Sequence, residues 1–127
     1  MNKMLRLNVG GTFEEIPVKG MTIEYEELHK AVGGYIEHVE FNRTLAELGI
    51  DVWCDEEGKI KGLEPSSYVV DFTGPSPRPI EVLAGPLVFT GRGADDNSYP
   101  LTDEQIEKIM AVFVRTPYLM ILPFERM

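Results

Sequence analysis

Few side chains in this 127-residue sequence have the types and spacing that catalysis requires. Triad or zinc chemistry would have to use His29, His38 and Cys54, since the chain has two histidines and one cysteine. A hydrolytic triad needs a nucleophile beside a base, and neither histidine lies in a recognised catalytic motif. Their separation fits no zinc spacing, and one cysteine completes no metal site. We therefore expect no metal and no cofactor.

A pair of carboxylates, Glu37 and Glu40, stands on one predicted strand and could serve as general acid and base. Carboxylates on a strand more often face solvent as partners of lysines. The sequence shows no feature that would raise the pKa of either carboxylate, as a general acid requires. Because no catalytic motif accompanies them, we expect a protein that is not an enzyme.

Binding chemistry has a separate basis, in a polar segment and in aromatic side chains. Arg92 lies in segment 91–98, where its guanidinium could bind a phosphate together with loop amides. Tyr35 and Trp53 could stack on a nucleotide ring, although aromatic strand residues more often belong to the core. The hypothetical ligand site comprises Arg92, Gly91, Gly93, Tyr35 and Trp53.

The charge balance restricts the partners. Twelve basic and 21 acidic side chains give a net charge of −9, which repels nucleic-acid phosphate and anionic membranes. We expect no direct nucleic-acid binding and no membrane association. The acidity suits a basic partner, or imitation of DNA by a face comprising Glu24, Glu27, Asp55, Glu56 and Glu57. Three lysines, Lys30, Lys59 and Lys61, interrupt that face, and dispersed acidic residues also favour solubility alone.

Length and composition predict a single domain, residues 1–127, because a chain of this size can bury roughly two-thirds of its unfolded surface. The hydrophobic content of 43% is ordinary for a globular protein. A lone cysteine forms no internal disulfide, and no apolar segment approaches ~20 residues. We expect a cytoplasmic protein.

Two glycines, Gly33 and Gly34, separate a predicted helix from a predicted strand. The helix has Thr22 as its expected N-cap and carries apolar residues at helical spacing up to the glycines. Gly33 can close the helix in the left-handed conformation, and Gly34 can turn the chain into strand 35–41. This hinge therefore positions Glu37 and His38.

Local patterns predict the other elements. Two hairpins are expected, one pairing 4–9 with 13–18 and the other pairing 50–54 with 59–63. Further expectations are a short helix at 43–48, a helical turn or bend at 65–67, an extended connection at 74–79, and strands at 80–83 and 87–90.

The C-terminal part has the strongest local signal. Thr102 and Gln105 form a capping box, so a helix begins at Asp103 and ends before Pro117, and 118–122 forms a last strand. The chain is thus predicted to be α+β, with a mainly antiparallel sheet and two principal helices packed on one face.

Three motifs resemble a known family. They are Val32-Gly33-Gly34-Tyr35-Ile36-Glu37, then Cys54-Asp55-Glu56-Glu57-Gly58-Lys59 with Gly62-Leu63, and Leu101-Thr102-Asp103-Glu104-Gln105-Ile106. In order and spacing they resemble a family of small uncharacterised proteins of bacteriophages, plasmids and other mobile elements, which carries a domain-of-unknown-function label. The resemblance implies a mobile-element origin and contributes no catalytic residues.

Three hypotheses follow. The first is a non-enzymatic phage or mobile-element accessory protein that binds a host protein in the host cytoplasm and acts against a host defence system. The second is a protein that sequesters a nucleotide or another small signalling molecule. The third is the acidic DNA mimic. The sequence leaves self-association into a homo-oligomer open.

Overall fold

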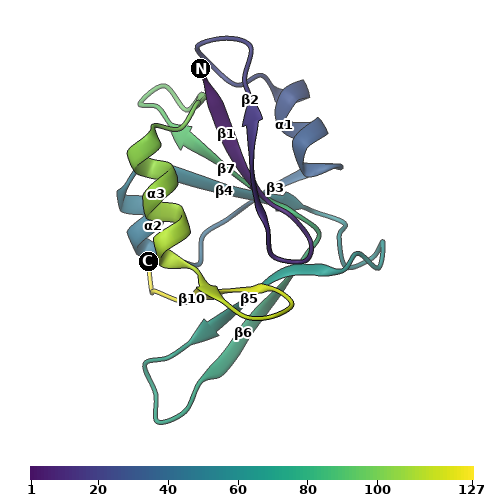
Figure 1. Cartoon of the computed structure of the whole chain (residues 1–127), viewed down its shortest axis with the longest axis vertical. Helices are drawn as coiled ribbons and strands as arrows, with labels where there is room; N and C mark the ends of the chain where they lie inside the picture. The colour runs from purple at the N-terminus through teal and green to yellow at the C-terminus, as the bar shows by residue number, and fades with distance from the viewer.

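The computed structural model describes residues 1–127, which form three helices and ten strands (Figure 1). The helices are α1 (Tyr25–Val32), α2 (Arg43–Glu47) and α3 (Asp103–Val112). The strands are β1 (Lys3–Leu7), β2 (Phe13–Pro17), β3 (Ile36–Val39), β4 (Ile50–Asp55), β5 (Pro65–Asp71), β6 (Arg78–Ala84), β7 (Leu87–Arg92), β8 (Ser98–Tyr99), β9 (Val114–Arg115) and β10 (Met120–Pro123). None of the helices has the length and apolar content needed to cross a membrane.

The strands form two sheets. The larger sheet has the order β2-β1-β7-β4-β3, with β8 also paired to β7, and the smaller sheet has the order β6-β5-β10-β9. Every pairing is antiparallel except that of β10 with β5. The predicted α+β class with mainly antiparallel sheets is confirmed.

Successive strand residues point to opposite faces of a sheet. In the larger sheet, residues at both sets of alternating positions are buried, so both of its faces are covered. On β1 and β7, Met4 and Val88 face α1 and join its buried residues in a cluster of seven. Their neighbours Leu5 and Phe89 face the other way, into a cluster of 16 that includes residues of α3 and the smaller sheet. Each face therefore needs its own cover.

The expectation that both principal helices pack on one face is thus corrected in the structure. Helix α1 covers one face of the larger sheet, whereas α3 and the smaller sheet cover the other (Figure 1). The apolar stripe of each helix gave no information on which face it would cover, because both faces of the sheet carry buried apolar residues.

The glycine pair behaves largely as predicted. Helix α1 ends at Gly33, which has φ 89° and donates its N–H to the His29 carbonyl. A Cβ on Gly34 would lie 2.6 Å from both the Asp55 carboxylate and the Lys61 ammonium, so this position accommodates an ion pair. At the other end Glu24, rather than Thr22, is the N-cap, in a capping box with Glu27.

The hairpin of β1 and β2 is confirmed, but the hairpin predicted for 50–54 and 59–63 is wrong. Strand β4 pairs instead with β3 and β7 and is an inner strand of the larger sheet. Residues 59–62 form turns, closed by hydrogen bonds such as that from the Leu63 N–H to the Gly58 carbonyl.

Other segments divide between agreement and correction. The short helix α2, the strands β6 and β7, and the last strand β10 were predicted, although with other bounds. Strand β6 begins at Arg78, within the predicted connection, because Arg78 and Pro79 pair with β5, and β7 continues to Arg92, where it pairs with β8. Segment 65–67 is the start of β5, not a helical turn or bend. Pro65 is compatible with this strand because it occupies the first position. The capping box of Thr102 and Gln105 is present at the start of α3.

Candidate functional site

Arg92, the proposed phosphate ligand, lies at the end of β7 and binds its own chain. Its Nη1 donates to Asp51 Oδ1 at 2.7 Å, and its Nη2 donates to the Ala46 carbonyl at 2.6 Å. The guanidinium thereby ties β7 to β4 and to the end of α2.

Close packing explains why glycines stand on either side of Arg92. A Cβ on Gly91 would lie 3.2 Å from the Tyr99 and Pro100 carbonyl oxygens, and one on Gly93 would lie 2.1 Å from the Tyr99 ring. Both glycines make room for β8 and the residues that follow it.

The two aromatic residues of the hypothetical site lie elsewhere. Trp53 is half-buried and donates its indole N–H to Thr90 Oγ1 at 2.9 Å. Tyr35 is 61% exposed and lies beside the Asp55 end of β4, whereas Arg92 lies beside its Ile50 end. A six-residue strand spans roughly 17 Å, so the structure does not bring these residues together. Ligand binding through them stays a prediction.

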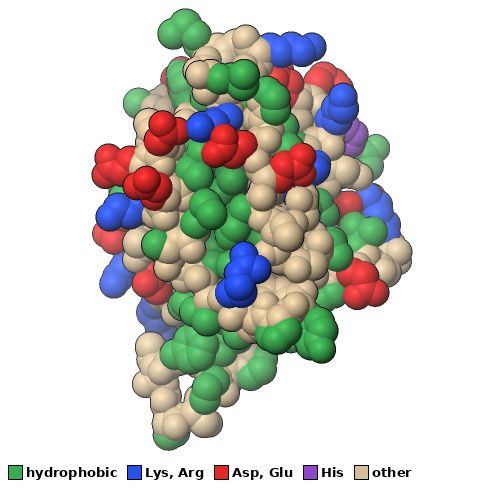
Figure 2. All heavy atoms as spheres, viewed as in Figure 1, with side chains coloured by type: hydrophobic (Ala, Val, Ile, Leu, Met, Phe, Trp, Pro, Cys, Tyr) green, Lys and Arg blue, Asp and Glu red, His purple; other side chains and the backbone are tan.

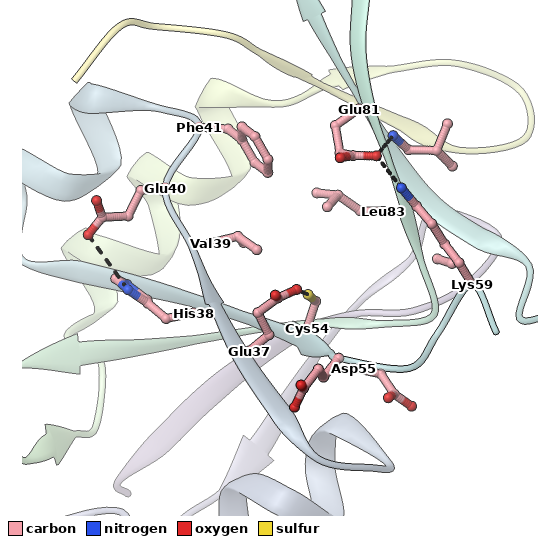
Figure 3. A pocket seen from close by; sticks show the side chains of 13 residues that line it. Glu37, His38, Val39, Glu40, Phe41, Cys54, Asp55, Lys59, Glu81 and Leu83 are labelled. Carbon is pink, nitrogen blue, oxygen red and sulfur yellow. Dashed lines mark hydrogen bonds and ion pairs between the residues drawn. The ribbon is translucent and has the colours of Figure 1, made fainter. Parts of the chain in front are cut away.

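A groove of about 460 Å³ lies between two edge strands, β3 of the larger sheet and β6 of the smaller sheet (Figure 3). We call it the edge groove. Val39 and Leu83 point into it from the two strands, and Phe41 lies on the same side of the ribbon as Val39 (Figure 3). These side chains belong to or border the larger core cluster, so the floor of the edge groove is apolar.

Carboxylates surround that floor. Five acidic residues line the edge groove, namely Glu37, Glu40, Asp55, Glu56 and Glu81. Two of them have lysine partners, since Lys61 binds Asp55 at 2.6 Å and Lys59 binds Glu81. Burial raises the pKa of Asp55, but the hydrogen bonds from Lys61 and from the Glu57 amide outweigh it, so this pKa lies below its usual value.

Glu37 differs from those two carboxylates. Its side chain is exposed, and its hydrogen-bond partner is the Cys54 thiol at 3.6 Å (Figure 3). No lysine, arginine or histidine of the chain pairs with it. The edge groove therefore presents a negative charge without a cation.

Cys54 is a poor nucleophile in this environment. Burial raises the pKa of its thiol to about 12, and the neighbouring Glu37 carboxylate acts in the same direction. The reactive form of cysteine is the thiolate, so at neutral pH Cys54 remains a protonated hydrogen-bond donor.

The two histidines lie apart from Cys54 and from each other. His38 Nε2 lies 3.1 Å from Asp51 Oδ1, and its Nδ1 lies 3.6 Å from Glu40, on the side of β3 away from the groove centre (Figure 3). His29 is on α1, where its ring lies 5.7 Å from that of Tyr25. The structure does not assemble them with Cys54 into a triad.

Sequence reasoning singled out Glu37 and Glu40 but missed Phe41, Lys59, Glu81 and Leu83 as parts of the same site. The sequence feature that pointed to this site was the short predicted strand after Gly33-Gly34, which carries Glu37. Its status as an edge strand, and the approach of β6, depend on how the two sheets pack.

The face proposed for DNA mimicry is also rearranged by the fold. Asp55 is buried with Lys61, while Glu24 and Glu27 cap α1. Outside that face, over the region of α3 and the β1–β2 hairpin, Figure 2 shows acidic and basic side chains interspersed.

These features define an α+β protein with two packed sheets and an acidic groove between their edges. The chain belongs to the family described as Domain of unknown function (DUF3846), whose model matches residues 2–114. No curated protein and no solved structure matches the sequence.

Proposed function

We propose that this chain is a non-enzymatic binding protein that holds a positively charged segment of a partner protein in the edge groove. The observation that carries the proposal is Glu37, an exposed carboxylate without a cation beside an apolar floor. Lysine and arginine have apolar stems and charged ends, so they match this combination. A charge-assisted hydrogen bond to Glu37 would fix the charged end.

The dimensions and charge of the edge groove support this proposal. Its volume of about 460 Å³ lies in the range of pockets that enclose small ligands or peptide side chains. The net charge of −9 favours the approach of a basic partner over long range.

The state of the titratable groups supports binding over catalysis. The thiol nearest the groove floor is protonated at neutral pH, and His38 is engaged by Asp51 and Glu40. A cysteine enzyme would need the opposite arrangement, with a base lowering the pKa of the thiol.

In the setting of a mobile element, the partner would be a host protein, and inhibition of a host defence system is the biological role that we propose. This part of the proposal rests on the family resemblance of the three motifs and on the acidic, accessible groove. Nucleotide sequestration stays the alternative, and thermal-shift measurements with nucleotide panels would detect it as a rise in Tm.

The test compares partner capture by three proteins. The groove variant is Glu37→Lys/Glu56→Lys, and the matched control is Glu104→Lys/Glu107→Lys on the exposed face of α3, which makes the same change in net charge. Circular dichroism establishes that all three are folded.

We expect the native protein and the control to recover the same partner from host lysate at stoichiometric yield, and the groove variant to lose it. Retention of the partner by the groove variant would exclude the edge groove. Loss from both variants alike would show that net charge, not the groove, governs capture. Recovery of no partner from several hosts would remove the proposal.

A further inference from the structure

Building on the proposed function, we propose that the partner segment binds as an added β-strand along the free edge of β3, with a lysine or arginine opposite Glu37 and an apolar residue opposite Val39. The edge groove then receives both side chains, while main-chain hydrogen bonds hold the segment.

The hydrogen-bond pattern shows which main-chain groups of β3 are free. The Tyr35 carbonyl accepts from the Glu56 N–H at 2.9 Å, and the register continues with Ile36 opposite Asp55 and Glu37 opposite Cys54. In an antiparallel pair, hydrogen-bonded and non-hydrogen-bonded positions alternate. The N–H and C=O groups of Ile36 and His38 therefore point away from β4, along the open edge.

Strands β2, β6 and β9 also lie at sheet edges, and each carries a feature that hinders strand addition. Strand β2 ends in Pro17, and β6 contains Pro79 and a register shift in its pairing with β5. Strand β9 has only two residues. Proline, bulges and short length are the usual protections of sheet edges. Strand β3 has four residues, twice the length of β9, and has neither a proline nor a register shift.

Glu37 is the feature that protects the β3 edge, and its charge makes this edge selective for basic strands. A carboxylate that faces a neighbouring layer discourages apolar strands, because its charge would lose water without compensation. A basic side chain directly opposite removes that penalty, since opposite-charge pairs across strands are favourable. The same residue therefore rejects most strands and accepts a basic one.

Strand periodicity fixes the pattern of the partner. Glu37 and Val39 are two residues apart and face the edge groove together, while His38 between them faces the opposite side. The partner must then have a basic residue and an apolar residue two positions apart. The residue between them is left on the side of His38 and Trp53, whose rings lie 5.1 Å apart.

A synthetic peptide, acetyl-Ser-Val-Thr-Lys-Thr-Val-Ser-amide, tests this inference, because its symmetric pattern fits parallel and antiparallel addition. Two controls accompany it. In the first, glutamate replaces the lysine. In the second, methyl groups on the main-chain nitrogens of both threonines, the lysine and the second valine remove the donors that would face Ile36 and His38 in either strand direction.

Binding is followed by NMR titration and by exchange of individual amide protons. At 90% occupancy we expect the amide protons of Ile36 and His38 to exchange about tenfold more slowly, since only the free fraction exchanges. Both control peptides should bind at least about tenfold more weakly, the first through like-charge repulsion and the second through lost hydrogen bonds.

Equal binding of the methylated peptide, without protection of these amides, would overturn strand addition and leave the edge groove as a binding site. If the native protein captures a partner through the groove but does not bind the peptide, the basic–x–apolar pattern is wrong while the proposed function stands. Equal binding of the glutamate peptide would overturn the role of Glu37.

Discussion

The ion pair between Asp55 and Lys61 gives the sharpest test of the folded structure. The Asp55 side chain is 1% exposed, and its carboxylate is held by Lys61 Nζ at 2.6 Å and by the Glu57 N–H at 2.8 Å. Lys61→Met removes the cation and leaves the buried charge with one main-chain donor.

The expected cost follows from this geometry. Breaking a fully buried pair from one side costs about 3–5 kcal/mol. Lys61 is 38% exposed and the Glu57 amide remains, so we expect about 2–3 kcal/mol. With about 2.1 cal/mol/K per residue over 127 residues, the unfolding entropy is roughly 0.27 kcal/mol/K, and Tm falls by about 7–11 °C.

Lys59→Met is the matched control, because it removes the same charge and the same side-chain atoms two residues away. Lys59 and Glu81 are 62% and 36% exposed, and such pairs contribute less than about 1 kcal/mol. Urea and thermal denaturation of both variants provide the comparison. Equal losses for the two lysines would refute the reasoning, because burial of Asp55 would then have no energetic consequence.

The pH dependence gives a second check on the same pair. The pKa of Asp55 is lowered in the folded protein, so its ionised form contributes stability above the unfolded pKa of about 3.9. That contribution is lost as the pH falls through the folded pKa. The difference between the native protein and Lys61→Met should therefore be full at neutral pH and shrink in acid. A difference that persists in strong acid would point to lost packing instead of lost charge pairing.

Three further predictions concern single residues. Gly33→Val should lower the free energy of unfolding by about 1–2 kcal/mol through backbone strain alone, since φ is 89° and no neighbouring atom lies within 4 Å of the added Cβ. Chemical denaturation measures this loss, with Gly33→Asn as the milder control. An unchanged free energy of unfolding in Gly33→Val would contradict the left-handed cap. Thr102→Ala should cost about 1 kcal/mol by removing the side-chain acceptor of the α3 capping box, and an unchanged denaturation midpoint would show that the cap contributes nothing. Cys54 should react with a disulfide reagent at mildly alkaline pH far more slowly in the folded protein than in urea, because the thiol is buried and its pKa is about 12; equal rates would show an accessible thiolate.

The sequence alone determined the features that depend on a few neighbouring residues. The left-handed end of α1 required a glycine, and the capping box of α3 required Thr102 and Gln105 at their spacing. The first hairpin followed from the strand patterns of 4–9 and 13–18, which lie close together in the chain. In each case the decisive contacts join residues close in the chain, so local pattern and structure agree.

Only the tertiary structure decided which elements distant in the sequence are neighbours in the fold. The pairing of β4 with β3 and β7, in place of a hairpin with 59–63, is a choice between partners of similar apolar pattern. The edge groove needs β3 and β6 from different sheets, so Glu37 and Leu83 meet through packing of the two sheets around one core. Strand patterns encode which face is apolar, but the neighbour that covers it is selected by the collective fit of all the elements.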